Sequence, residues 1–141
     1  YIYFNCFDQT VPDPESLSIK LSEPHFGIGG DGIILISPSD KADAQMRIFN
    51  ADGSEGKMCG NGIRCVGKYL YDNGMTDGRT TITIDTLSGV KTLELTVKDG
   101  KMQSARVDMG AAILLRGRFP LIWTAKMSSA HPSLWTKRST T

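Results

Sequence analysis

The sequence predicts an α+β fold, because short strand-like runs outnumber helical ones and two of these runs are joined by a hairpin turn. Runs of β-branched, aromatic or alternating apolar residues predict six strands: residues 1–7, 32–37, 44–50, 81–86, 90–98 and 103–109. Asp99-Gly100, between the last two runs, is typical of a tight hairpin turn. Two further segments have helical spacing, so the chain alternates strands with helices.

The first helix is predicted to begin just after Asp13. Asp13-Pro14 resembles an N-cap followed by proline at the first helical position, where the missing N–H has no partner to lose. Leu17 and Leu21 lie four residues apart and therefore share one face. Pro24 is expected to end the helix, because proline cannot donate the next backbone hydrogen bond.

The second helix is predicted over residues 63–72. Ile63, Val66 and Leu70 recur at helical spacing and would line one apolar face. Asn73-Gly74 follows as a typical C-terminal stop, since both residue types adopt the left-handed backbone conformation that ends many helices.

Length, charge and cysteine content bound the function classes. A chain of 141 residues with a net charge of +1 fits one domain, and its mixed charges create no field that would attract nucleic acid or an acidic membrane. No apolar run approaches the ~20 residues of a membrane span. Three cysteines do not suggest a disulfide framework, so the composition favours the cytoplasm. The chain begins at Tyr1, inside an expected strand, and we expect the natural N-terminus to lie upstream.

The most informative segment joins Cys59 to the second helix. Cys59 is followed by Gly60-Asn61-Gly62 and then by the helical pattern, so its thiol lies at the positive end of the helix dipole. Backbone N–H groups are unpaired there, and the glycines let a small anion approach them. The same position favours the thiolate form of a cysteine. A reactive thiol beside an anion-binding turn predicts covalent or proton-transfer chemistry on a carboxylate.

Two sequence blocks at a fixed distance carry a family resemblance. RIFNADGSE, residues 47–55, and MCGNGIRC, residues 58–65, resemble the signature of diaminopimelate epimerases, cofactor-independent enzymes of bacterial lysine biosynthesis. A looser similarity extends from Tyr1 to about Gly110 and includes HFGIGGDGIILI and VDMG. The family has two lobes. The resemblance implies that residues 1–112 form the first lobe, with its strands curled around the second helix as an open barrel, and that the second lobe is absent.

The resemblance also implies roles for four residues. Cys59 matches one of two cysteines that exchange a proton with the α-carbon from opposite faces. Gly60 and Asn61 match positions whose backbone amides hold the substrate α-carboxylate, and Asn50 matches an asparagine that binds the distal amino acid head. The implied substrate is the small amino acid diaminopimelate, with no cofactor, metal, nucleic acid or membrane partner. A homodimer is left open for full-length members, and this chain, with one base, is expected to be inactive alone.

Each of these residues also has a purely structural interpretation. Cysteine is among the most buried residue types, a glycine-rich turn is common before a helix, and Asn50 is as well suited to open a turn over residues 50–53. Cys65 lies six residues further along the helix, ~9 Å up its axis and on another face. We therefore expect Cys65 to pack in the core rather than to serve as the second base. Cys6, in the first strand, is expected to be structural too.

Other function classes have weaker support in the sequence. A cysteine hydrolase needs a histidine beside the thiol, and neither His25 nor His131 has such a context. The cysteine and histidine spacing does not match a zinc site. GIGGDG, residues 27–32, lacks a P-loop lysine and predicts a tight turn near the site; Gly32 stands where some family members carry a substrate-contacting glutamine. Related proline racemases, phenazine-type isomerases and a non-catalytic module remain alternatives.

Residues 113–141 depart from the family pattern. The segment 116–141 carries both tryptophans and no acidic residue. Codons can be chosen from Phe119 onward so that a one-base shift encodes IPADLDGEDVISAPIVVDKEKYY, which alternates like strands and turns and resembles the family's continuation. We therefore hypothesise a reading-frame break between about Ile113 and Phe119. A solvated tail, or a segment that docks on a partner, is the alternative.

Overall fold

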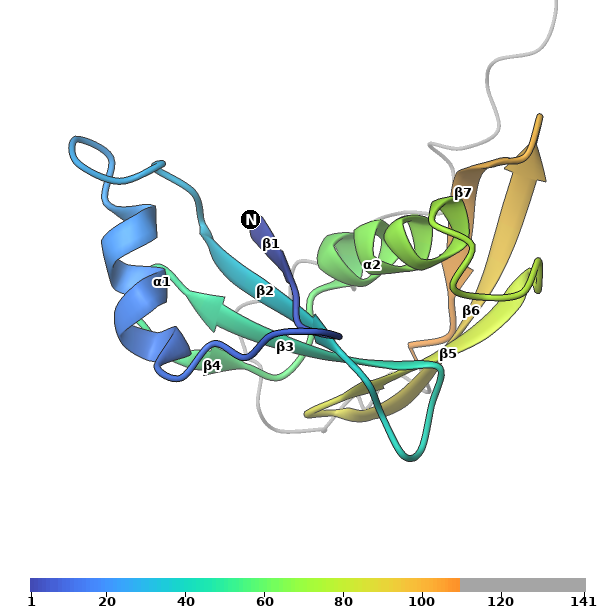
Figure 1. Ribbon diagram of the computed structural model, residues 1–141, viewed down its shortest axis with the longest axis horizontal. Coiled ribbons are helices and arrows are strands. Elements are labelled where there is room, and N and C mark those ends of the chain that lie inside the picture. The colour runs from blue at the N-terminus through green and yellow to red at the C-terminus, as the bar shows by residue number, and fades with distance from the viewer. Residues whose placement is uncertain (110–141) are drawn as a thin grey trace, which may run out of the picture. The chain divides into compact units, whose positions relative to one another are not determined.

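The computed structural model describes residues 1–109, so the predicted boundary at residue 112, the segment 113–141 and His131 lie outside the described residues. The described elements follow in this order (Figure 1): β1 (Ile2–Asn5), α1 (Pro14–Ser22), β2 (Gly32–Ser37), β3 (Ala44–Asn50), β4 (Glu55–Gly56), α2 (Gly60–Asp72), β5 (Thr81–Thr86), β6 (Gly89–Lys98) and β7 (Lys101–Val107). Neither of these helices is long and apolar enough to cross a membrane.

All described strands belong to one mixed sheet. Its order is β1-β2-β3-β5-β6-β7, and the short β4 pairs with β3 beside that path. The β1–β2 and β3–β5 pairs are parallel, whereas the β2–β3, β3–β4, β5–β6 and β6–β7 pairs are antiparallel. The sheet curls around α2 as a half-barrel (Figure 1). The predicted α+β class, with a mostly antiparallel sheet around a central helix, is confirmed.

Predicted and observed element bounds agree best in the middle of the chain. The bounds of β2, β3 and β5 are those predicted. α2 begins at Gly60, three residues before the predicted start, because the glycine-rich turn already forms the first helical turn. β7 begins and ends two residues early, and β1 is shorter than expected. The two-residue β4 was not predicted, since such a short strand has no periodicity of its own.

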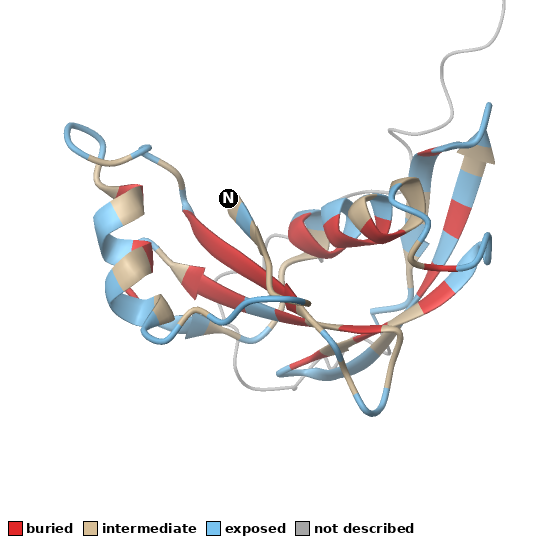
Figure 2. Cartoon of the chain, viewed as in Figure 1, coloured by how far each residue is buried: buried red, intermediate tan, exposed pale blue. Residues whose placement is uncertain are grey.

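The larger core cluster lies between α2 and the sheet. The inner face of α2 is buried (Figure 2) at Gly62, Ile63, Val66, Gly67 and Leu70. A Cβ added at Gly62 would lie 2.7 Å from Ile34 Cδ1, and one added at Gly67 would lie 2.8 Å from Leu93 Cδ2. Two glycines on this face therefore let the helix approach the sheet more closely than alanine would allow.

The smaller core cluster lies under α1. Ile33, Leu35 and Phe49 form its buried centre, and Leu17 and Leu21 pack against it. Since Ile34 and Ile36 belong to the α2 side, successive β2 residues point alternately to the two helices, as strand geometry requires. β2 is thus buried on both faces, which explains why its sequence is continuously apolar.

Both ends of α1 have the predicted signals. The Asp13 side chain accepts a hydrogen bond from the Ser16 N–H at 3.1 Å, and Pro14 occupies the first helical turn. The helix ends at Ser22, before Pro24. The cap and the proline therefore act here as their residue types predict.

The C-terminal end of α2 is tied to the start of β7. The ammonium of Lys68 lies 2.8 Å from the Asp72 carboxylate and donates to the Met102 carbonyl oxygen at 2.7 Å. The Met102 N–H donates in turn to Asp72 Oδ1 at 2.9 Å. Two side chains of the helix thus satisfy both backbone groups of one strand residue.

Candidate functional site

Cys59 occupies the N-cap of α2, as the sequence predicts. Its extended backbone (φ −135°, ψ 114°) places the side chain over the first helical turn, where Sγ accepts a hydrogen bond from the Gly62 N–H at 3.3 Å. Its carbonyl oxygen accepts from the Ile63 N–H at 2.9 Å. The residue is half-buried, so the sulfur is held by the helix without being sealed inside the core. The positive end of the helix dipole lies beside this sulfur.

Gly60 and Asn61 offer the anion-binding part of the site. The helix satisfies the Gly62 and Ile63 amides through Cys59, which leaves Gly60 and Asn61 as the N–H donors without a helical acceptor at this end. A Cβ built on Gly60 would meet no atom within 4 Å, and Asn61 is exposed. A carboxylate can therefore approach these two amides from open space.

Two tyrosines of the first strand segment, which the sequence analysis did not single out, lie beside the helix. Tyr1 lies close enough to Cys59, and Tyr3 close enough to Cys65, for each cysteine to affect the pKa of the neighbouring phenol. Burial first, and then the nearby Cys59 and Asp31, raise the pKa of the Tyr1 phenol. Burial first, and then the nearby Cys65, raise the pKa of Tyr3. The available sequence signal was the spacing of two residues, which puts both rings on one face of a strand.

Asn50 lies at the end of β3 and forms the turn that its alternative interpretation predicts. Its Nδ2 donates to Ser54 Oγ at 3.0 Å, and its N–H donates to the Ser54 carbonyl oxygen at 2.9 Å. Its own carbonyl oxygen accepts from Gly53 N–H and from the Ser18 hydroxyl. The second amide hydrogen and Oδ1 keep capacity for a ligand, so the turn role and a binding role are compatible.

Gly32 stands directly opposite Asn50 in the β2–β3 pair. Its φ is +138°, and a Cβ added there would lie 2.1 Å from the Phe49 carbonyl oxygen. A larger side chain at this position would therefore need a different backbone. The turn before β2 brings Asp31 close enough for its charge to act on Tyr1.

The expectation that Cys65 packs in the core is wrong. Cys65 is exposed and lines a cavity of about 400 Å³, together with Arg64, Lys68 and residues 102–105 of β7. Six residues of helix separate Cys65 from Cys59, and the face of α2 that carries Cys65 is exposed rather than packed in the core. Cys6 is half-buried against the α1 cluster, and burial raises the pKa of its thiol.

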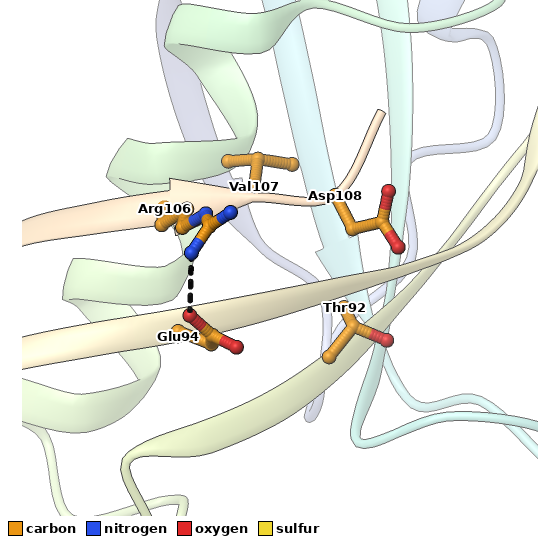
Figure 3. Close-up of a pocket in the computed structure, with 5 residues that line it drawn as sticks. All are labelled: Thr92, Glu94, Arg106, Val107 and Asp108. Atoms are coloured by element: carbon orange, nitrogen blue, oxygen red, sulfur yellow. Dashed lines mark ion pairs between the residues drawn. The ribbon is translucent and has the colours of Figure 1, made fainter. Parts of the chain in front are cut away.

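A second cavity, of about 430 Å³, lies on the β6–β7 hairpin. Figure 3 shows its lining residues: Thr92, Glu94, Arg106, Val107 and Asp108. The only ion pair drawn there joins Arg106 to Glu94 at 3.8 Å, and both side chains are largely exposed. Exposed pairs of this length contribute little, and the cavity contains none of the predicted site residues. The chemistry of Cys59 and its neighbours, rather than cavity size, identifies the candidate site.

The chain matches one protein family over all of its described residues. Residues 1–115 fit the family model for diaminopimelate epimerase. The chain is 55% identical over 121 residues to the diaminopimelate epimerase of Acetivibrio thermocellus, which covers 86% of this chain and 43% of that protein. It is 51% identical over 132 residues to that of Methanococcus maripaludis, which covers 94% of this chain and 46% of that protein. The chain therefore spans less than half the length of these relatives.

Solved structures of other isomerases share the fold. A probable proline racemase from Agrobacterium radiobacter K84 superposes with a TM-score of 0.58 at 25% identity, covering 70% of this chain and 30% of that one. A hydroxyproline epimerase from Agrobacterium vitis, with bound trans-4-hydroxy-L-proline, gives 0.57 at 23% identity, covering 70% of this chain and 30% of that one. The solved structures at about 25% identity come from isomerases of different kinds, whereas both relatives at 51–55% identity are diaminopimelate epimerases. On that ground the chain belongs to the diaminopimelate epimerase family.

Proposed function

We propose that this chain supplies one half of the active site of an epimerase that interconverts LL- and meso-diaminopimelate without pyridoxal phosphate. The observation that carries the proposal is the Cys59 sulfur at the N-cap of α2, directly before the two free amides of Gly60 and Asn61. The relatives named above carry the same enzyme name. In the cell the reaction would serve lysine and peptidoglycan precursor synthesis in the cytoplasm.

Cys59 acts in this proposal as one of two acid/base groups. Its thiolate takes the α-proton of the substrate and becomes a thiol, while the electron pair of the broken C–H bond stays on the α-carbon. An acid on the opposite face then delivers a proton to that carbon, which inverts the centre. The return reaction exchanges the two roles.

The Gly60 and Asn61 amides would hold the α-carboxylate and stabilise the carbanion. Negative charge that develops next to the carboxylate lies at the positive end of the α2 dipole, where donors are already oriented. Asn50 would bind the distal amino acid head with the amide capacity that its turn leaves free. A small amino acid is thus the proposed partner of this site.

The acid that protonates the opposite face of the α-carbon has to come from outside this half of the active site. Cys65 does not supply it, because six residues of helix carry it ~9 Å along the axis of α2, away from Cys59. We therefore propose a second cysteine in the remaining half of the full-length enzyme, and no turnover by the present chain. Incubation in D₂O with meso-diaminopimelate should give no deuterium at the α-carbon; exchange that Cys59→Ala abolishes would contradict the expected inactivity.

Ligand protection tests the substrate class on the chain itself. Iodoacetamide labelling of Cys59 is followed by mass spectrometry, with Cys6 and Cys65 as internal controls. A high concentration of meso-diaminopimelate should slow labelling at Cys59 and leave Cys65 unchanged, because the carboxylate occupies the space beside the thiol. Failure of diaminopimelate to protect Cys59 would reject the proposed binding site.

Racemisation of a proline-like substrate is the second candidate, favoured by the shared fold. Proline and trans-4-hydroxyproline enter the same protection experiment as matched ligands. Protection by proline at lower concentration than by diaminopimelate would assign the site to this second class.

A further inference from the structure

Asn50 and Ser54 are joined by hydrogen bonds of both main chain and side chain. The Asn50 N–H donates to the Ser54 carbonyl oxygen at 2.9 Å, and Asn50 Nδ2 donates to Ser54 Oγ at 3.0 Å. Asp52 lies between them in the turn, and its Oδ1 accepts from the Ser54 N–H at 2.9 Å and from the Ser54 hydroxyl at 2.6 Å. The three side chains therefore form a row of hydrogen bonds that runs from the Asn50 amide to the Asp52 carboxylate.

The direction of each side-chain hydrogen bond in this row follows from the charge of Asp52. The Ser54 hydroxyl first, and then the Ser54 N–H, lower the pKa of the Asp52 carboxyl, so the group is ionised at neutral pH and can only accept. The Ser54 hydroxyl therefore donates its single proton to Asp52 and offers only lone pairs to Asn50. A flipped Asn50 amide would place Oδ1 against the Ser54 oxygen with no proton between them. The NH₂ group of Asn50 consequently faces Ser54, and Oδ1 faces away from it.

The main chain at Asn50 is held by contacts that do not involve the Ser54 hydroxyl. The buried Ser18 hydroxyl of α1 lies 2.7 Å from the Asn50 carbonyl oxygen and 3.0 Å from that of Phe49. The Gly53 N–H also donates to the Asn50 carbonyl oxygen, at 2.9 Å. Alanine at position 54 would keep these contacts and both main-chain hydrogen bonds of Ser54. We therefore expect the hydroxyl to control the orientation of the Asn50 side-chain amide and not the path of the turn.

The orientation of the Asn50 amide decides which ligand groups it can bind. Among the described residues, Ser54 is the one hydrogen-bond partner of the Asn50 side chain, so Oδ1 and the second N–H remain for a ligand. Oδ1 can only accept and an ammonium group can only donate, and such a charge-assisted hydrogen bond is stronger than a neutral one. A ligand head that has a carboxylate but no amino group offers Oδ1 no donor.

We propose that Ser54 is a positioning residue, which fixes the Asn50 amide so that the site prefers a ligand with an ammonium group on its distal head. Asp52 takes the Ser54 proton, Ser54 orients Asn50, and Asn50 binds the ligand. Ser54 itself does not touch the ligand. The inference rests on the proposed function, because it states what the distal part of the same site selects.

The test compares two ligands of equal length. meso-Diaminopimelate and α-aminopimelate have the same two carboxylates, and only the first has an amino group at the distal end. Their dissociation constants for the chain are measured at pH 7 from the shifts of the Gly60 and Asn61 amide signals in NMR spectra. In the unmodified chain we expect diaminopimelate to bind about tenfold more tightly than α-aminopimelate, as one charge-assisted hydrogen bond allows.

Four variants test the part of Ser54 in this preference. Ser54→Ala should lower the preference about three- to tenfold, because the freed amide can turn either of its groups toward the ligand. Ser54→Thr keeps the hydroxyl and should keep the preference. Asn50→Ala should abolish it, and adding Ser54→Ala to Asn50→Ala should then change nothing, because Ser54 acts only through Asn50.

Ser39→Ala is the matched control. The Ser39 hydroxyl also holds a turn, since it accepts from the Lys41 N–H at 3.1 Å, but that turn carries no predicted site residue. Ser39→Ala should therefore keep the ligand preference of the unmodified chain.

A second measurement needs no ligand. The side-chain amide signals of Asn50, identified by their loss in Asn50→Ala, report the hydrogen bond to Ser54 directly. Ser54→Ala should move them toward the positions of a free asparagine amide, whereas Ser54→Thr and Ser39→Ala should leave them in place. An unchanged midpoint of urea unfolding establishes that each variant keeps the fold.

Two outcomes would overturn the inference. One is a Ser54→Ala chain with the Asn50 signals and the ligand preference of the unmodified chain. The other is an effect of Ser54→Ala on binding that is equally large with and without the Asn50 side chain, which would show that Ser54 acts elsewhere in the turn.

Failure of the proposed function has a different signature. If the unmodified chain binds neither ligand, the diaminopimelate site is rejected and the ligand preference with it. If diaminopimelate binds with the same preference in Ser54→Ala as in the unmodified chain, the site stands and Ser54 has no part in it.

Discussion

At the scale of single residues, two glycines lack a side chain for opposite physical reasons. Gly32 has φ +138° and its missing Cβ would lie 2.1 Å from the Phe49 carbonyl oxygen, whereas Gly60 has free space where its Cβ would be. The first glycine is required by the close approach of β2 to β3. The second leaves room for a ligand, so we expect a side chain at Gly60 to affect ligand binding more than the stability of the fold.

Alanine substitutions should separate these two roles. We expect Gly32→Ala to lower the free energy of unfolding by about 3 kcal/mol or more, because both the backbone angle and a main-chain oxygen oppose a Cβ. Gly60→Ala should change it by less than about 0.5 kcal/mol. Urea unfolding measures both. Equal destabilisation by the two substitutions would contradict the difference in their surroundings.

Residues that depend on local signals were predictable, and those that depend on distant neighbours were not. Cys59 and Asp13 were predicted as helix-start residues because a cap is set by the residues directly around it. The closeness of Tyr1 to Cys59 depends on the pairing of β1 with β2 and on how α2 crosses the sheet. The exposure of Cys65 depends on the same arrangement, and helical spacing alone could not reveal it.

At the scale of elements, β3 and β5 pair over fewer residues than any other two neighbours in the strand order β1-β2-β3-β5-β6-β7. In this parallel pair, Ala44 stands beside Ile84 and Gln45 beside Asp85. Asp43 reinforces it: its carboxylate accepts from the Thr83 N–H at 2.7 Å and from the Thr83 hydroxyl at 3.0 Å, and pairs with Arg79 at 2.6 Å. One side chain therefore joins the two antiparallel parts of the sheet.

Asp43→Asn should weaken this junction in a pH-dependent way. Burial opposes the charge of Asp43, but Arg79 and the Thr83 donors outweigh it and lower the pKa of the carboxyl. A lowered folded-state pKa means that the ionised group stabilises the fold above the unfolded value of about 3.9 and that this stability is lost as the pH falls through the folded value. We expect a loss of about 1–2 kcal/mol at pH 7.

The measurement is urea unfolding of both chains from pH 7 to pH 2. The difference between the unmodified chain and Asp43→Asn should be constant down to about pH 4 and then shrink. Asp40→Asn, in the exposed turn just before, is the matched control and should follow the unmodified chain. A difference that grows on acidification would contradict the assigned role.

At the scale of the whole molecule, the described residues pack as two layers of side chains on either side of β2 and β3. One cluster joins the sheet to α2 and the other joins it to α1. Leu17 and Leu21, which the sequence predicts on one face of the first helix, both pack against the cluster under α1. The curl of the sheet around α2 was predicted only from the family resemblance. The twist of a sheet, and the order of strands that are distant in the sequence, produce no periodicity in the amino-acid pattern.

The hypothesis of a shifted reading frame makes a prediction about the gene. Restoring one base between the codons of about Ile113 and Phe119 should give a continuous frame that begins with IPADLDGED and runs on into a second lobe with its own cysteine. Resequencing the encoding DNA, with the downstream region, is the measurement. An unbroken frame through residue 141, with no second-lobe sequence in any downstream frame, would end the hypothesis.

The link between α2 and Met102 has a consequence for how molecules of this chain meet one another. β7 ends the described sheet, and a terminal strand normally offers its outer main-chain groups as a template on which another polypeptide can assemble. At Met102 that template is already occupied, because Lys68 covers the carbonyl oxygen and Asp72 the N–H. An incoming strand would have to displace an ion pair before it could stack, and this protects the molecule against fibril-like growth at that border.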